Sequence, residues 1–195
     1  DAYAVVQALD PAASFQAYAS VIDNASGDPV NVTPVSVGSE PVWVPGTAHL
    51  TGAGGTNWRT DLEVLNAGYG QATFTLELYP RDVATTVPLT RTFTLERGRA
   101  VRYADVLREV FAFTGGAALR VVPATGEIAV SSRTYNQLPD RTFGQYTPAF
   151  AESGLTLTGR EVRLLLLSHS PSRDQGFRTN LGLASTVGEI LDDPA

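Results

Sequence analysis

The chain has 195 residues, enough for one large domain or two small ones. It contains no cysteine, methionine or lysine, which excludes disulfides, thiolate-bound metals, thiol nucleophiles and lysine Schiff bases. The net charge of −6 argues against nucleic acid and anionic lipid, because both bind clustered positive charge. We therefore expect a folded protein without a cofactor, and not an enzyme.

The ends and the composition bear on location. The chain begins without Met or a basic stretch, as a mature or excised product would. Its apolar runs are far shorter than the roughly 20 residues of a membrane-spanning helix. A Thr-, Gly- and Pro-rich chain that lacks oxidisable Met and Cys is typical of an extracellular bacterial protein. We expect an extracellular or cell-surface location and no membrane span.

Alternation of apolar and polar residues predicts β-strands along most of the chain. In residues 73–79, for example, Phe74, Leu76 and Leu78 alternate with polar side chains, which places one face in a core. The same pattern predicts strands at residues 4–9, 14–22, 61–65, 90–95, 119–122, 127–134, 161–167 and 179–183. Turn-forming clusters separate them. Short strands with frequent turns favour an all-β fold of tandem antiparallel, immunoglobulin-like sandwiches.

One segment has a different period. In residues 103–111 the apolar side chains recur at spacings of three and four, which predicts a short amphipathic helix. The Gly-Gly pair at 115–116 follows it. We expect this helix to be a crossover that closes one end of a sandwich.

Two stretches of sequence recur. Residues 58–64 (WRTDLEV) match residues 177–183 (FRTNLGL) at an offset of 119. Ser, Asn and Asp residues spaced along segment 20–28 recur in segment 132–140 at an offset of 112, and each set is followed by a Thr-Pro pair. The matches run in opposite directions along the chain, so they predict a repeating unit of about 110 residues that is cut in two places.

The repeat predicts three parts. Residues 37–150 form a complete sandwich, residues 1–36 the closing strands of an incomplete one, and residues 151–195 the opening strands of another. Two explanations stay open. The chain is an excerpt of a longer tandem array, or its incomplete sandwich is completed by a strand from a neighbouring chain.

The second explanation predicts a head-to-tail polymer. An incomplete sandwich exposes unpaired backbone groups and an open core, and strand exchange between neighbours would cover both. The alternative for each apolar terminal segment is an ordinary edge strand. The candidate assembly residues in these segments are Tyr3, Val5, Val6, Val187, Ile190 and Leu191.

Residues 48–62, 132–136 and 176–183 resemble tandem β-sandwich repeats of large secreted proteins from Acidobacteria-like bacteria. The resemblance covers most of the chain and implies secretion, tandem sandwiches and a role in surface architecture. It implies no chemistry. The chain departs from a regular array because the middle strands of its second unit are missing.

Catalytic candidates are few. His49 and His169 are the side chains that could move protons at neutral pH. His169 lies between two serines, but neighbours on a strand face opposite sides and no orienting acid is evident, so we expect a solvent-facing turn. The Gly-rich residues 52–55 follow His49 without the spacing of a phosphate-binding loop.

Asp23, Asn24 and Asp28 offer oxygen donors within six residues, which makes them weak candidates for a calcium-type cation site. The spacing lacks the Gly and the distal Glu of an EF-hand loop. We favour a turn stabilised by side-chain to backbone hydrogen bonds.

The repeated motif places Arg59 and Asp61 in one copy and Arg178 and Asn180 in the other. Alternation directs these side chains away from the core, so we expect polar contacts between strands or between units. A sugar-binding strip of Arg, Asn and Tyr is the alternative.

The sequence as a whole predicts an extracellular structural protein that associates with itself into a head-to-tail filament or surface array. The alternative is a carbohydrate-binding or adhesive module of a larger secreted protein, with surface polysaccharide as partner.

Overall fold

The computed structural model describes residues 3–10, 12–156, 160–172, 175–177 and 179–186. Its strands are β1 (Ala19–Ile22), β2 (Pro29–Val32), β3 (Val42–Thr51), β4 (Asn57–Asn66), β5 (Ala72–Pro80), β6 (Leu89–Leu95), β7 (Ala100–Tyr103), β8 (Gly115–Thr125), β9 (Ile128–Gln137), β10 (Thr142–Pro148) and β11 (Phe150–Ala151). Its helices are α1 (Val106–Phe111) and the short 3-10 turns η1 (Ala53–Gly55) and η2 (Glu152–Gly154). The predicted all-β antiparallel fold with one short α-helix is confirmed.

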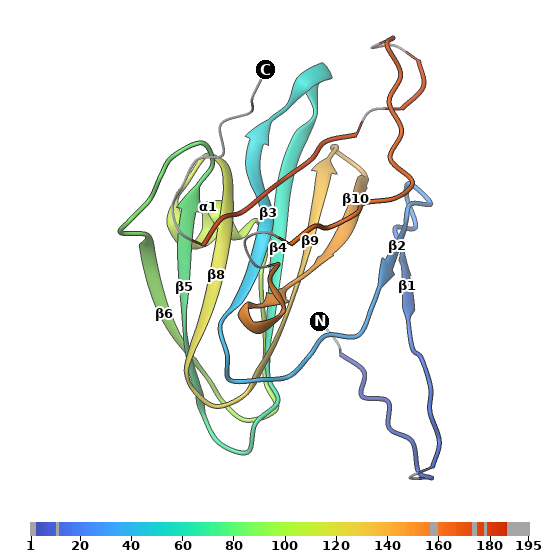
Figure 1. Ribbon diagram of the computed structural model, residues 1–195. Coiled ribbons are helices and arrows are strands. Elements are labelled where there is room, and N and C mark those ends of the chain that lie inside the picture. The colour runs from blue at the N-terminus through green and yellow to red at the C-terminus, as the bar shows by residue number, and fades with distance from the viewer. Residues whose placement is uncertain (1–2, 11, 157–159, 173–174, 178, 187–195) are drawn as a thin grey trace.

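Two layers of antiparallel strands make up the sandwich (Figure 1). The β9 sheet contains β10, β9, β4 and β7, and the β8 sheet contains β6, β5, β8, β3 and β11. Strand β3 joins them, because most of it pairs with β8 while its last two residues pair with β4. A register shift between Val44 and Thr47, at the Pro-Gly pair, separates two stretches of the β8 pairing.

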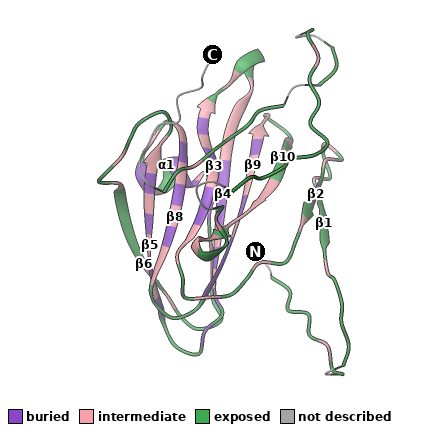
Figure 2. Ribbon diagram, viewed as in Figure 1, coloured by how far each residue is buried: buried purple, intermediate pink, exposed green. Residues whose placement is uncertain are grey.

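The core follows the predicted alternation. On β5 the side chains of Ala72, Phe74, Leu76 and Leu78 are buried, while those between them are half-buried (Figure 2). Leu62 and Val64 of β4 and Val130 of β9 face them from the other sheet. Burial of a leucine or phenylalanine side chain contributes about 1.5–3 kcal/mol, so this set is the main source of stability.

The predicted helix lies at one end of the sandwich. Val106, Leu107 and Phe111 of α1 are buried in the core cluster, and Tyr103, which the pattern assigned to the helix, ends strand β7 instead. Asp105 precedes the helix in the left-handed region, with φ of 53°. A chain leaving β7 reverses direction at this residue and enters the helix, which covers the open end of the core.

The two terminal parts differ from the prediction. Residues 4–9, 161–167 and 179–183 do not form strands, and of residues 14–22 the last four form β1. Their alternating pattern is real, but a strand needs a neighbour to satisfy its backbone groups, and no described segment lies in register with them. We refer to residues 3–36 as the N-terminal arm and to residues 160–186 as the C-terminal arm.

The sandwich itself runs from Gly38, which bridges to Ile128, to the 3-10 turn that ends at Gly154. The predicted complete unit, residues 37–150, lies within almost the same bounds, although the division of the chain into whole and partial repeats stays a prediction. In the described part of the chain, none of the helices has the length and apolar character needed to cross a membrane.

Candidate functional site

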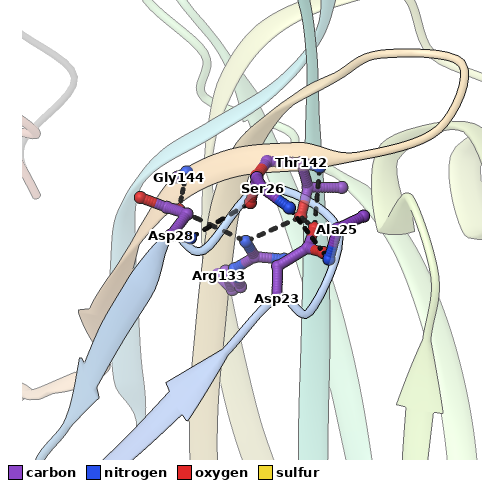
Figure 3. A network of polar contacts seen from close by, with 7 residues as sticks. All are labelled: Asp23, Ala25, Ser26, Asp28, Arg133, Thr142 and Gly144. Atoms are coloured by element: carbon purple, nitrogen blue, oxygen red, sulfur yellow. Dashed lines mark hydrogen bonds and ion pairs between the residues drawn. The ribbon is translucent and has the colours of Figure 1, made fainter.

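The first polar site joins the N-terminal arm to the sandwich (Figure 3). The turn between β1 and β2 lies against β10, the edge strand of the β9 sheet. Asp23 accepts hydrogen bonds from the backbone N–H and the hydroxyl of Thr142, at 2.8 and 2.7 Å. Its other oxygen accepts from the N–H of Ala25 at 2.9 Å, which shapes the turn. One carboxylate thus organises the turn and holds it against the sheet.

A second carboxylate of the same turn bonds two residues farther along β10. Asp28 accepts from the N–H of Gly144 at 2.9 Å, and Arg133 of β9 lies 3.8 Å from the same oxygen. Ser26 completes the contact by donating its hydroxyl to the carbonyl of Thr142 at 2.9 Å.

These contacts cover an exposed sheet edge. The N–H groups of Thr142 and Gly144 point away from β9, so without the turn they would be free to pair with another chain. Asp23 and Asp28 accept them instead. The oxygens that made these residues cation candidates are therefore engaged by protein donors, while Asn24 is exposed in the turn. The described residues include no group of three or more His, Cys, Asp or Glu that could hold a metal ion.

The donors hold the pKa of the Asp23 carboxyl well below its usual value, and the largest cause is the hydrogen bond from the Thr142 hydroxyl. Each donor bonds the ionised form, which favours it. The turn is therefore docked by a charged carboxylate under all ordinary conditions.

The second polar site is a cluster beside the start of α1. Asp105 Oδ2 lies 2.7 Å from His49 Nδ1 and 3.2 Å from Arg59 Nε. Asp61 accepts from the N–H of Asp105 and from the hydroxyl of Tyr135, both at 3.0 Å. These residues come from β3, β4, β9 and the turn before α1, so the cluster ties together four parts of the sandwich.

Arg102 of β7 completes the cluster through a short ion pair with Asp61. The hydrogen bond that Arg102 donates to Asp61 raises the pKa of the Arg102 guanidinium. Burial is the largest cause that raises the pKa of Tyr135 to about 12, with the Asp61 charge adding to it. Asp61 is almost fully buried, so these partners replace the hydrogen bonds that water would make to its carboxylate.

One residue connects the two sites. The Arg133 guanidinium lies 4.9 Å from the centre of the Tyr135 ring and donates to the Thr142 hydroxyl at 2.9 Å. A continuous path of polar contacts therefore runs from the N-terminal turn through Arg133 and Tyr135 to Asp61 and Asp105.

The cluster has limited chemical capacity. His49 bonds Asp105, but among the described residues no hydroxyl lies within hydrogen-bonding distance of its ring, so the pair lacks the nucleophile of a hydrolytic triad. His169 is exposed in the C-terminal arm. The Gly-rich residues 52–55 close the hairpin between β3 and β4 through η1. The contacts of this cluster join β3, β4, β9 and the start of α1 to one another.

The assembly candidates lie in the arms where they are described. Val5 and Val6 are 80% and 63% exposed. Tyr3 is half-exposed, and its hydroxyl donates to the Gly98 carbonyl at 3.3 Å. Val187, Ile190 and Leu191 lie outside the described residues, as does Arg178.

The repeated motif occupies two different environments. In the sandwich, Arg59 and Asp61 make the contacts between elements described above. In the C-terminal arm, Asn180 is exposed and lines a shallow groove of about 530 Å³ together with Trp43 and Tyr79. The first copy of the motif therefore connects elements within the sandwich. Asn180 of the second copy lies beside the β8 sheet.

Sequence reasoning missed Asp105, Arg133, Tyr135 and Thr142. They have no shared motif, because their relation depends on the pairing of β4 with β9 and of β9 with β10. One signal was available, since Arg133 lies on the predicted strand 127–134 and Tyr135, two residues on, shares its face once the strand continues to Gln137.

The chain matches no family model and no curated protein. Among solved structures it is similar to one described as "Crystal Structure of Thermotoga maritima 1070", with 12% identity and a TM-score of 0.48. That match covers 60% of this chain and 98% of the other. At this level of similarity we transfer neither fold nor function from it, and the proposals below depend on the chain itself.

Proposed function

We propose that the protein is a non-catalytic structural subunit that assembles head to tail, outside the cell, through its two arms. The observation that carries the proposal is the exposure of strand-patterned apolar side chains in both arms. Large apolar residues that are more than half exposed include Tyr3, Val5, Val6, Leu9, Phe15, Tyr18, Val162, Leu164, Leu165, Leu166, Leu167, Phe177, Leu181 and Leu183.

Such surfaces need a cover. Soluble monomers rarely expose large contiguous apolar patches, and larger ones mark interaction sites or aggregation hazards. The sandwich does not need the arms for its own core, because every residue of its core cluster comes from β3 to β9 and the helix between them. Each arm carries some of the strands of the repeating unit, and the other arm carries further ones. A second copy of the chain can therefore supply the strands that pair with an arm.

The docked turn supports the same proposal. Asp23 and Asp28 close the β10 edge, which removes one route to uncontrolled pairing between sandwiches. Association is thereby directed to the arms. A composition without Cys, Met or Lys supports the extracellular placement.

The proposal is tested on the full chain by negative-stain electron microscopy and by light scattering over a range of concentrations. We expect elongated polymers whose mass rises with concentration. A Val5→Asp, Val6→Asp double variant places charge in the N-terminal arm and is expected to stay monomeric. Val87→Asp is the matched control, because Val87 is 84% exposed in the loop between β5 and β6. A wild-type chain that stays monomeric at all concentrations would overturn the proposal.

The carbohydrate-binding alternative stays a prediction without a specific observation in its favour. The exposed aromatics of the sandwich, Tyr69, Phe143 and Phe150, lie on a turn, on β10 and on β11. Within the described residues, the paired aromatic rings join Trp43 to Tyr79, Phe74 to Phe93 and Phe93 to Tyr103, and most of these rings are wholly or partly in the core. The exposed rings of the sandwich thus lie on three separate elements, whereas a sugar stacks on rings that lie together.

A further inference from the structure

The complete sandwich shows which of its strands the arms repeat. The offset of 112 places residues 3–13 on β8 and residues 16–25 on β9. The offset of 119 places residues 161–170 on β3 and residues 176–185 on β4. The stretch that ends in Thr33-Pro34 corresponds to β10.

These five strands are neighbours. The order across the sandwich is β10-β9-β4-β3-β8-β5-β6, so the counterparts carried by the two arms make up its first five places without a gap. Of the strands without a counterpart in the arms, β5 and β6 are at the other end of this order, and β7 pairs with β4 off it. In the β9 sheet, strands of different arms would meet at one junction. There the counterpart of β9 in the N-terminal arm would lie beside the counterpart of β4 in the C-terminal arm.

Each arm already folds back on itself. In the N-terminal arm, β1 and β2 form an antiparallel hairpin as β9 and β10 do, but with the register shifted by two residues, so that Ser20 lies opposite Asn31 and not opposite Thr33. In the C-terminal arm the chain folds back where β3 turns into β4. There the Ser170 N–H donates to the Phe177 carbonyl at 2.8 Å, and the Thr179 hydroxyl donates to the Ser168 carbonyl at 2.7 Å.

The junction itself is open. β1 pairs with β2 on one edge, and among the described residues no strand pairs with its other edge, where β4 lies in the complete unit. The face that β4 turns to the core corresponds to Phe177, Leu181 and Leu183, which are 73%, 75% and 69% exposed. Tyr18 and Ile22 occupy the corresponding face of the N-terminal arm and are also exposed.

The N-terminal hairpin and residues 180–186 of the same chain lie against different sheets of the sandwich. The turn of the N-terminal arm is bonded to β10 in the β9 sheet. Residues 180–186 of the C-terminal arm line the groove beside β3, β5 and β8 in the other sheet, and Figure 1 shows these strands on the side away from β1 and β2. A second copy can supply its C-terminal arm to β1 without breaking the Asp23 and Asp28 contacts.

We infer that β1 of one copy pairs antiparallel with residues 179–183 of the next, with Ser20 opposite Leu181. This inference rests on the proposed function and assigns its contact. The register is that of β4 and β9, in which Leu62 lies opposite Ser132. By the same transfer, the pairing of Thr47 with Ala117 places Leu166 opposite Val5.

The register gives a cysteine cross-link with a defined geometry. In the hairpin the Asp23 N–H donates to the Asp28 carbonyl at 3.1 Å, and alternation from that pair turns the backbone groups of Ser20 away from β2, so Ser20 and Leu181 would form a hydrogen-bonded pair. Such pairs have Cα atoms about 5.5 Å apart, within the range that a disulfide spans. The chain has no cysteine of its own, so introduced thiols report a single contact.

The experiment mixes two full-length single-cysteine chains, Ser20→Cys and Leu181→Cys, and oxidises them with diamide. We expect a disulfide-linked dimer of unlike chains, formed roughly fivefold or more in excess over the pair Ser20→Cys and Leu183→Cys, which is two residues out of register. Val5→Cys with Leu166→Cys is a second in-register pair. Equal yields from the in-register and out-of-register pairs would overturn the inference.

A chain with both Ser20→Cys and Leu181→Cys identifies the occupant. Pairing between copies gives a ladder of linked multimers on a non-reducing gel, whereas pairing within one chain gives a cyclised monomer and overturns the inference. Filaments seen by microscopy of the unmodified chain, together with a failed in-register cross-link, would overturn this register while supporting the proposed function. A cyclised monomer together with an absence of filaments would overturn both.

Discussion

Asp61 shows how much one buried carboxylate can organise. It accepts from Arg102, from the Tyr135 hydroxyl and from the Asp105 backbone, so it fixes β7, β9 and the entry to α1 relative to β4. Removing it leaves buried donors without partners, and that penalty exceeds the value of any one bond. The repeat flagged the position through its second copy, but its partners depend on strand register, which the motif does not encode.

The Asp61→Ala variant is expected to lower the free energy of unfolding by about 3 kcal/mol, because it breaks a buried ion pair and two hydrogen bonds at once. Urea unfolding of the full chain followed by tryptophan fluorescence measures the loss. Asp140→Ala is the control, since Asp140 is exposed and pairs with the adjacent Arg141. The control is expected to change stability by less than about 0.5 kcal/mol. Equal losses in both variants would contradict the assigned role.

At the scale of elements, alternation predicted β4, β5, β6, β8 and β9, which have partners inside the unit, missed β3 and β10, and failed for the terminal segments that have no partner. The alternation in 73–79 became β5 because β6 and β8 flank it. The equally regular residues 4–9 and 161–167 remain outside any sheet. Periodicity reports which face a strand would bury, whereas pairing decides whether the strand forms. The candidate site depended on the same information, because docking of the N-terminal turn on β10 is a contact between elements.

Docking of that turn is expected to depend on the Asp23 charge. Its pKa is lower in the folded chain than in the unfolded one, so the stabilisation is complete above the unfolded value near 3.8 and is lost as the pH falls through the folded value. Asp23→Ala is expected to speed hydrogen exchange of the Thr142 amide several-fold at pH 6, as measured by NMR. Asp10→Ala is the control, because Asp10 bonds the N–H of Ala12 in its own turn. Unchanged exchange at Thr142 would contradict the docking role.

At the scale of the whole molecule, composition determines how stability responds to alkali. With no lysine and no cysteine, tyrosine is the side chain that titrates between about pH 9 and pH 12. Tyr79, Tyr103 and Tyr135 each have a pKa raised to about 12, with burial the largest cause. Ionising any of them in the folded state places a charge in or beside the core.

The pKa of a buried tyrosine such as Tyr103 is higher in the folded chain than in the unfolded chain. Its neutral side chain therefore stabilises the fold fully below the unfolded pKa near 10, and this stabilisation is lost as the pH rises toward 12. The unfolding free energy is therefore expected to fall by roughly 1 kcal/mol per buried tyrosine between pH 8 and pH 11. In the Tyr103→Phe variant this fall, measured by urea unfolding at the two pH values, is expected to be smaller by the contribution of one tyrosine, about 1 kcal/mol. Tyr69→Phe, at an 87% exposed ring, is the control. An identical fall in the Tyr103→Phe variant would contradict the prediction.

The place where the chain enters and leaves the sandwich has a mechanical consequence. β11 pairs with the first residues of β3, Phe150 opposite Trp43 and Ala151 opposite Val42, so the two arms leave the sandwich side by side. Tension applied between the arms would separate this short ladder from its end, one pair at a time, with little load reaching the core. Glu152 holds the junction through Arg120 at 2.6 Å and the Trp43 indole at 2.8 Å. In a stretched filament the sandwiches would lie to one side of the line of force. The β11-β3 pairing and the Glu152 contacts would be the first to break.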